Sequence, residues 1–368
     1  MNIKKAFLLY VTSVCMICCQ ANAELTAEEK QIIEADRLIS KLVNMSSKQI
    51  NDTKMEKENT IQSLITIGDP AVPNLLNQFN IDNQDYSVRH SIVRILGDIK
   101  SDRARTGLKD IVLTNKNDIG ANIKLWAASR YIESIQKKED VVFLFESDNA
   151  SILSMSLYAA QGISLDAQLL SKVDPFLVNQ NKTIRWAATK VYEKDPSTTF
   201  YSQKIKSIIH AIDKTYTYSD ANDIMPRSHL TYANVDLQNY IQALYNMNGP
   251  VGVLQEAVPH ASSMLARDSL VISLAMRGDR SIKSKLIHII IENKNDMLRL
   301  MAVKGLGNIG DKDDLPLLHD VSQKDPFCYD RNNVEMHTSA SLETIYPIRE
   351  MAQKSIKNIM QFPLEQKQ

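Results

Sequence analysis

A short pattern of apolar and polar positions recurs along the chain. In its clearest copy, a cation at Arg299 is followed by apolar residues three, seven and ten positions later and then by a glycine. These followers are Ala302, Leu306, Ile309 and Gly310. Offsets of three, seven and ten fall on one face of a helix with 3.6 residues per turn, and glycine is a typical helix stop. Each copy therefore predicts an amphipathic helix that ends in a turn.

The copies are spaced as the second helices of repeated helix pairs. The first positions of these second helices are Lys57, Arg89, Lys124, Ser154, Arg185, Leu237, Arg267, Arg299 and Arg349. Most steps between them are 30 to 35 residues, and two are longer, 52 and 50 by subtraction. This period predicts an all-α fold, a right-handed α-α superhelix or solenoid of about eight to nine helix pairs, in which each repeat buries its apolar face on its neighbours.

Turn residues and composition place the boundaries of the solenoid. Gly68-Asp69-Pro70-Ala71-Val72-Pro73 closes one helix with glycine and opens the next with proline. We expect residues 24–56 to form an N-terminal capping helix region and residues 57–368 to form the repeats. The two long steps place insertions near residues 214–233 and 325–347, each between the first and second helix of its repeat.

The first 23 residues predict a secretory signal peptide. Lys4 and Lys5 precede an apolar run over residues 6–17, and Ala21-Asn22-Ala23 supplies small residues at the usual cleavage spacing. The run is shorter than the about 20 residues of a membrane-spanning helix. Cleavage after Ala23 predicts an exported protein, periplasmic or secreted; the alternative is an N-terminal membrane anchor.

Charge and cysteine content narrow the functional classes. The chain has 43 basic and 43 acidic residues and four cysteines, and removal of the signal segment leaves 41 basic against 43 acidic residues and Cys328 alone. A near-neutral chain lacks the concentrated basic surface that nucleic-acid binding needs. A single cysteine forms no internal disulfide, so we expect packing to stabilise the fold.

Several segments resemble HEAT repeats, in the short variety also seen in phycobilisome lyase-like proteins. They are Ile67-Gly68-Asp69-Pro70-Ala71-Val72-Pro73, Val88-Arg89 with Ile95-Leu96-Gly97-Asp98-Ile99, and Leu298-Arg299 with Gly305-Leu306-Gly307-Asn308-Ile309-Gly310. The resemblance implies that the arginine opening a second helix pairs with an aspartate shortly before it. Asp85 before Arg89 and Asp296 before Arg299 match this pattern, whereas Arg185 and Arg267 have no such aspartate close upstream.

The enzymes of this class offer a test of chemistry. The metal-binding hydroxylases use His-Glu pairs as iron ligands, and none of the seven histidines here is followed by glutamate. We find no glycine-rich phosphate loop, nucleophile elbow or paired zinc histidines. The sequence therefore predicts a protein that is not an enzyme and that needs no cofactor and no metal, and we expect it to bind a protein or peptide partner.

Candidate partner-binding residues come from two places. Offset five of the second helices, on the face opposite the apolar stripe, forms a broken basic stripe of Arg94, Lys190, Lys304 and Lys354. Trp186, at offset one, is a candidate interface anchor, whereas Trp126 is expected to pack between repeats. The insertions contribute the tyrosines Tyr218, Tyr232 and Tyr329.

Three alternatives stay open at this stage. The insertions could build an enzyme or metal site, for which the second insertion holds Cys328, Asp330, Glu335 and His337. The basic stripe could bind an anionic surface polymer in a structural envelope protein. Both features also have a plain structural reading, because lysines solvate helix faces and long surface insertions cost little entropy.

Overall fold

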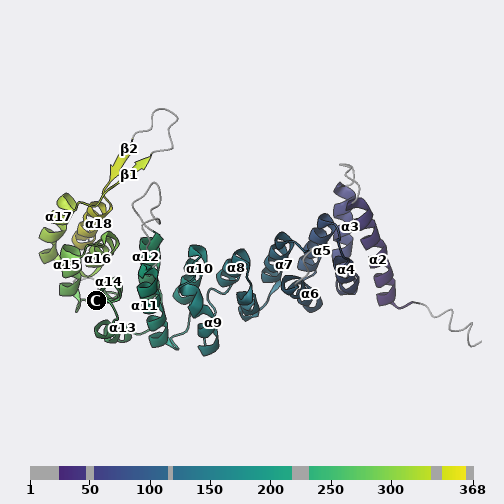
Figure 1. Ribbon diagram of the computed structural model, residues 1–368, viewed down its shortest axis with the longest axis horizontal. Helices are drawn as coiled ribbons and strands as arrows, with labels where there is room; N and C mark the ends of the chain where they lie inside the picture. The colour runs from purple at the N-terminus through teal and green to yellow at the C-terminus, as the bar shows by residue number, and fades with distance from the viewer. Residues whose placement is uncertain (1–24, 47–53, 115–118, 218–231, 333–341, 362–368) are drawn as a thin grey trace, which may run out of the picture. The chain divides into compact units, whose positions relative to one another are not determined.

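The computed structural model describes residues 25–46, 54–114, 119–217, 232–332 and 342–361. It divides into two compact units, an N-terminal unit over Met1–Gln136 and a C-terminal unit over Lys137–Gln368, drawn together in Figure 1. The predicted signal peptide lies outside the described residues. Within the described ranges, no helix combines the length and the apolar character needed to cross a membrane.

Three helix pairs make up the described part of the N-terminal unit, and each first helix packs on the second helix that follows it. The pairs are α2 (Ala27–Ser46) with α3 (Lys54–Ile67), α4 (Val72–Phe79) with α5 (Tyr86–Ile99), and α6 (Asp102–Leu113) with α7 (Ala121–Ser134). The short 3-10 turn η2 (Asp69–Ala71) precedes α4, where the sequence places its glycine-proline boundary. The predicted capping helix is thus the first member of a full pair.

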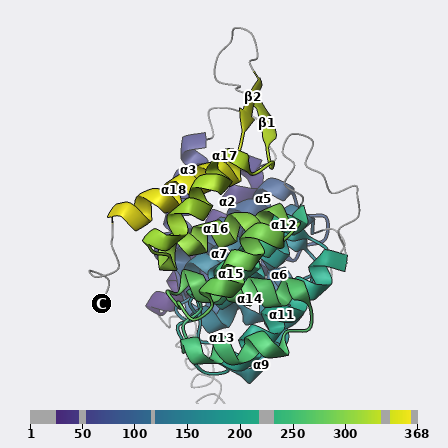
Figure 2. The ribbon, with the colours of Figure 1, turned by 90° about the vertical axis from the view of Figure 1, so that its left-hand side faces the viewer.

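The described part of the C-terminal unit holds six further pairs (Figure 2). Their first helices are η3 (Lys138–Glu146), α9 (Ala167–Leu177), α11 (Tyr201–Thr217), α13 (Val251–Ala257) with η4 (Val258–His260), α15 (Lys283–Glu292), and η5 (Lys312–Asp314) with α17 (Leu315–Lys324). Their second helices are α8 (Ala150–Ala159), α10 (Lys182–Glu193), α12 (Tyr232–Asn246), α14 (Met264–Met276), α16 (Asp296–Ile309) and α18 (Pro347–Gln361).

Successive second helices pack on one another and carry the core. In the N-terminal unit α3 packs on α5 and α5 on α7. In the C-terminal unit the same succession runs over α8, α10, α12, α14, α16 and α18. The apolar template positions are buried: Leu306 is 0% exposed and Ile309 is 1% exposed. Burial of one stripe per helix against the neighbouring repeats is the defining property of a solenoid, so the predicted all-α solenoid of helix pairs is confirmed.

Glycines inside the second helices mark the closest helix contacts. A Cβ added to Gly97 would lie 2.8 Å from the Arg130 Cβ on α7, and one added to Gly307 would collide with Ser355 on α18. The Ser355 hydroxyl donates to the Val303 carbonyl of α16 at 2.9 Å. Glycine lowers helix propensity, but at these positions a side chain would collide with the neighbouring helix. Glycine therefore allows the two helices to pack closely.

The cation that opens the template binds the end of the preceding first helix. Arg89 donates from Nε to the Phe79 carbonyl at 3.2 Å, at the last residue of α4. Lys124 donates to the Thr114 carbonyl just after α6, and Arg349 donates from Nε to the Asp325 carbonyl just after α17 at 2.7 Å. The last carbonyls of a helix lack donors within the helix and carry the negative end of its dipole. A cation there donates the missing hydrogen bond and also interacts favourably with the dipole.

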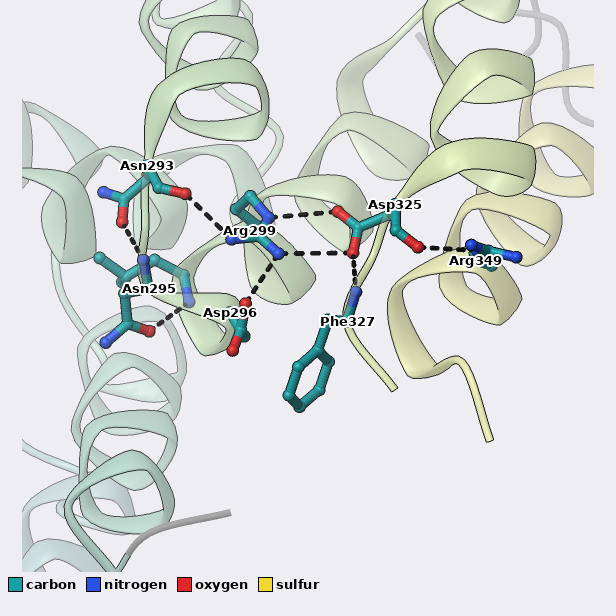
Figure 3. A network of polar contacts seen from close by, with 8 residues as sticks. Asn293, Asn295, Asp296, Arg299, Asp325, Phe327 and Arg349 are labelled. Carbon is teal, nitrogen blue, oxygen red and sulfur yellow. Dashed lines mark hydrogen bonds and ion pairs between the residues drawn. The ribbon is translucent and has the colours of Figure 1, made fainter. Parts of the chain in front are cut away.

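Arg299 extends this arrangement into a network that joins three helices (Figure 3). Its Nη1 donates to the Asn293 carbonyl after α15 at 3.1 Å, and its Nη2 donates to Asp296 at 2.7 Å. Its Nε donates to the Asp325 carboxylate at 3.2 Å. That carboxylate also accepts the Phe327 amide at 3.0 Å. The pairing of Arg299 with Asp296 agrees with the arrangement that the HEAT resemblance implies.

Arg185 obtains its aspartate from a different place. It pairs with Asp236 through Nε at 2.9 Å and Nη2 at 2.5 Å, and its Nη1 donates to the Asn179 carbonyl at 2.7 Å. Asp236 belongs to α12, the next second helix, 51 residues later in the chain. Asp85, in contrast, caps α5 by accepting the backbone amides of Ser87 and Val88.

The second predicted insertion contains a β-hairpin, which the sequence analysis did not predict. Strand β1 (Tyr329–Asn332) pairs antiparallel with β2 (Leu342–Ile345), with Tyr329 opposite Ile345. Most of the first predicted insertion, near residues 214–233, lies outside the described residues, which resume at Tyr232 after α11 ends at Thr217. Both connections join a first helix to its second helix.

We predict that Arg299→Met lowers the free energy of unfolding by about 3 kcal/mol, because it leaves the buried Asp325 carboxylate without its cation. Arg267 holds the same template position but is exposed, so Arg267→Met is the matched control and is expected to change stability by at most about 0.5 kcal/mol. Denaturant unfolding followed by circular dichroism measures both. Equal shifts in the two variants would contradict the role assigned to the opening cation.

Candidate functional site

Two members of the predicted basic stripe are neutralised by carboxylates. Arg94 makes a two-pronged pair with Glu58 of α3, at 2.8 Å and 2.5 Å, and its hydrogen bonds are the main reason that the pKa of Glu58 is lowered. Lys190 pairs with Glu193, whose side chain is 3% exposed. Neither cation offers an uncompensated charge to a partner.

The other two members retain their charge. Lys304 on α16 and Lys354 on α18 are exposed, and neither forms an ion pair in the part of the chain that the structure describes. These two helices pack on each other. The basic stripe is therefore reduced to one pair of unneutralised lysines at the end of the C-terminal unit.

Trp186 lies beside a second aromatic residue from the neighbouring helix. Its ring on α10 is 5.2 Å from that of Tyr158 on α8, centroid to centroid, with the planes tilted by 43°. Tyr158 is 52% exposed, and Trp186 is half-buried. Two large amphipathic rings held together at the surface present contact area with little conformational freedom left to lose. The sequence analysis singled out Trp186 but missed Tyr158, which lies one position from the face used for that prediction.

A polar group two turns beyond Trp186 on α10 is fixed by the next second helix. The Glu193 carboxylate accepts from Asn246 at 2.8 Å, from Gln242 at 3.3 Å and from Lys190. Burial alone would raise the pKa of this carboxyl, but the hydrogen bonds from Lys190 and Asn246, together with the positive charges of Lys190 and Lys194, outweigh burial and lower the pKa. The carboxylate therefore stays charged and ties α10 to α12. We call Tyr158, Trp186, Lys190, Glu193 and Gln242 the aromatic face.

Trp126 corrects one prediction. The sequence analysis expected it to pack between repeats, yet it is 45% exposed. The centroid of its ring on α7 lies 5.0 Å from that of His90 on α5 in a T-shaped arrangement, and the ring of Tyr86 stacks on His90 at 6.2 Å. The indole lies against a side chain of the neighbouring helix instead of entering the interface between the helices, so much of it remains at the surface.

The environment of His90 disfavours its protonation. Partial burial lowers its pKa from the ordinary 6.5, and the positive charges of Lys57, Arg130 and Arg94 lower it further. The imidazole, in contact with two aromatic rings, is thus held neutral at neutral pH.

Only some of the residues in the two predicted insertions belong to the described part of the chain. Tyr218 lies outside the described residues, as do Glu335 and His337, and Tyr232 is the first residue of α12. Tyr329 opens β1 and is half-buried, and Cys328 is a free, half-buried thiol just before it. Among the residues with described positions, no group of three or more His, Cys, Asp or Glu side chains is arranged to hold a metal ion.

Comparison with known proteins finds likeness in structure alone. No protein-family model matches the sequence, and the search of curated proteins also found no match. Among solved structures, the chain is similar to human deoxyhypusine hydroxylase in complex with glycerol, with 14% sequence identity over 90% of this chain and 98% of that chain. The TM-score is 0.27.

This comparison corrects the prediction that the protein is not an enzyme. The similar structure is that of an enzyme, and the prediction is therefore not kept. At a TM-score of 0.27 the likeness establishes no activity for this chain.

The chain contains two tryptophans, one in each unit, so single-tryptophan variants report on the units separately. In Trp186→Phe, we predict that Trp126 emission is quenched on acidification as His90 becomes charged, with a midpoint below pH 6.5 because the His90 pKa is lowered. The quenching should vanish in the matched control that adds His90→Gln.

The same shift predicts a pH dependence of stability. Because the folded state favours neutral His90, its contribution to stability is present above about pH 6.5 and is lost as the pH falls from there toward the lowered folded-state pKa. A quenching midpoint at or above pH 6.5, or quenching that persists without His90, would contradict this account.

Proposed function

We propose that the protein is a scaffold that binds a protein or peptide partner through the aromatic face of its C-terminal unit. The observation that carries this proposal is the contact of the exposed Tyr158 ring with the half-buried Trp186 ring. Tyrosine and tryptophan dominate the binding energy of interfaces because they bury large area with few rotatable bonds. A HEAT-like array of helix pairs supports the proposal, since such arrays present extended surfaces made of successive helices.

The charges on this face and farther along the C-terminal unit indicate the chemistry of the partner. Glu193 is already engaged by Lys190 and two amides, so it does not repel an incoming carboxylate as a free charge would. Lys304 and Lys354 are exposed and unneutralised. We therefore propose a partner segment with an apolar or aromatic side chain for the Tyr158–Trp186 pair and with acidic residues farther along it, at the level of α16 and α18, whose attraction to the lysines speeds association.

We also propose that the protein is exported to the cell envelope, with cleavage after Ala23. The support is the sequence pattern of residues 1–23. The mass of the protein purified from its native compartment tests this proposal. A mature N-terminus at Glu24 is expected, and an intact N-terminus in a membrane fraction would favour the anchored alternative.

A second candidate function rests on the same two lysines. Lys304 and Lys354 on packed neighbouring helices could bind an anionic surface polymer without help from the aromatic pair. Such binding would be strongly weakened by salt and would survive loss of Trp186.

The test is a pull-down from the native envelope fraction with the chain from residue 24 onward. We predict that Tyr158→Ala and Trp186→Ala each weaken capture of a specific partner about tenfold or more. The matched control is Met264→Ala, which removes an apolar side chain that is 70% exposed on α14. Tyr158 is so exposed that its loss leaves folding unaffected, which circular dichroism checks. Unchanged capture by both aromatic variants would overturn the proposal.

A further inference from the structure

We propose that a cleft between α11 and α13 binds a small organic cation, an amine whose apolar body lies along the cleft and whose ammonium group pairs with Asp213. The cleft has a volume of about 730 Å³ and lies within the C-terminal unit. Sites for small molecules have volumes of about 300–1,000 Å³. First helices form this cleft, so it is a different surface from the aromatic face, which second helices form. The inference therefore goes beyond the proposed scaffold function.

Asp213 supplies an oriented carboxylate at one end of the cleft. It lies near the end of α11 and is half-buried. Its two oxygens each accept one hydroxyl, from Ser262 and from Ser263, which lie between η4 and α14. These bonds orient the carboxylate without neutralising it, and its remaining lone pairs can accept hydrogen bonds from a ligand. Within the described residues Asp213 forms no ion pair, so a cationic ligand supplies the partner that this carboxylate lacks.

The charge of the lining as a whole also favours a cation. Glu256 on α13 adds a second carboxylate, which is exposed and has no ion pair in the part of the chain that the structure describes. Lys206 opposes these charges from a position seven residues before Asp213 on α11, about 10 Å away along the helix axis. The imidazoles of His210 and His260 add no charge in their neutral form. Two carboxylates against one lysine leave the Asp213 end of the cleft negative.

Apolar side chains from both helices belong to the lining. Ile209 on α11 and Val253 and Ala257 on α13 are half-buried, so each still offers apolar surface to a ligand. The lining along α11 runs from Ser202 to Asp213, about 16 Å at a rise of about 1.5 Å per residue. The four-carbon stem of a lysine from a partner protein would use little of this length. The cleft therefore fits a whole small molecule with an ammonium group at one end.

Isothermal titration calorimetry with the purified protein tests the proposal, with octylamine as the probe and octanoate as its oppositely charged analogue. We expect octylamine to bind at least about tenfold more tightly than octanoate, because only the amine can pair with Asp213. Butylamine, which has a shorter apolar chain, should bind at least about tenfold more weakly than octylamine. Asp213→Asn keeps the shape of the side chain but removes its charge, and it should weaken octylamine binding by about tenfold or more.

The matched control is Asp148→Asn, which makes the same charge change at an exposed position just before α8, outside the cleft. It should leave octylamine binding unchanged, and so should Trp186→Ala, which separates this proposal from the scaffold function. Circular dichroism checks that each variant is folded. Equal weakening by the two aspartate variants, or no binding of octylamine, would show that the proposal is wrong. If octanoate binds as tightly as octylamine and Lys206→Gln abolishes its binding, the cleft takes an anion and the proposed cationic ligand is wrong.

Discussion

The fold depends on a cation placed at the start of a second helix, where it closes the end of the first helix. Without it, the last carbonyls of the first helix would face an apolar neighbour with no donor. Arg89, Lys124, Arg185, Arg299 and Arg349 all supply this donor. The cation lies three positions before the first residue of the apolar stripe, on the same side of its helix. The contact that ends one helix therefore also fixes the rotation of the next helix about its axis. Arg299 and Arg185 add a carboxylate from the following repeat, which turns a helix cap into a link between repeats.

The architecture could be predicted because every determinant of it is local. Apolar residues at offsets three, seven and ten, a glycine, proline or aspartate at many of the turns and a period near 32 residues are visible without any partner. Long-range pairing is different: nothing near Arg185 indicates that its carboxylate comes from Asp236, 51 residues later. The hairpin of β1 and β2 was missed for a similar reason, since its two short strands stabilise each other across a connection and neither has a strong pattern alone.

The candidate site was predictable only in part. Trp186 could be placed at the surface from its offset in α10. Its contact with Tyr158 joins two helices, and the pattern within either helix does not reveal how the two are aligned. The basic stripe shows the opposite case. Four cations share an offset, yet Arg94 and Lys190 are neutralised by Glu58 and Glu193, so a shared helix position does not give shared electrostatics. The free charge of Lys304 and Lys354 emerges only after every neighbouring carboxylate has been placed.

The pair of Arg185 and Asp236 has a consequence for how this chain can change over evolutionary time. It ties α10 directly to α12 and so holds the register of two repeats without using the connection between α11 and α12. Residues can be gained or lost in that connection at the small entropic cost of a longer loop, while the stacking on either side keeps its anchor. The connection is therefore a position where lineages can diversify in length and composition without first having to rebuild a core.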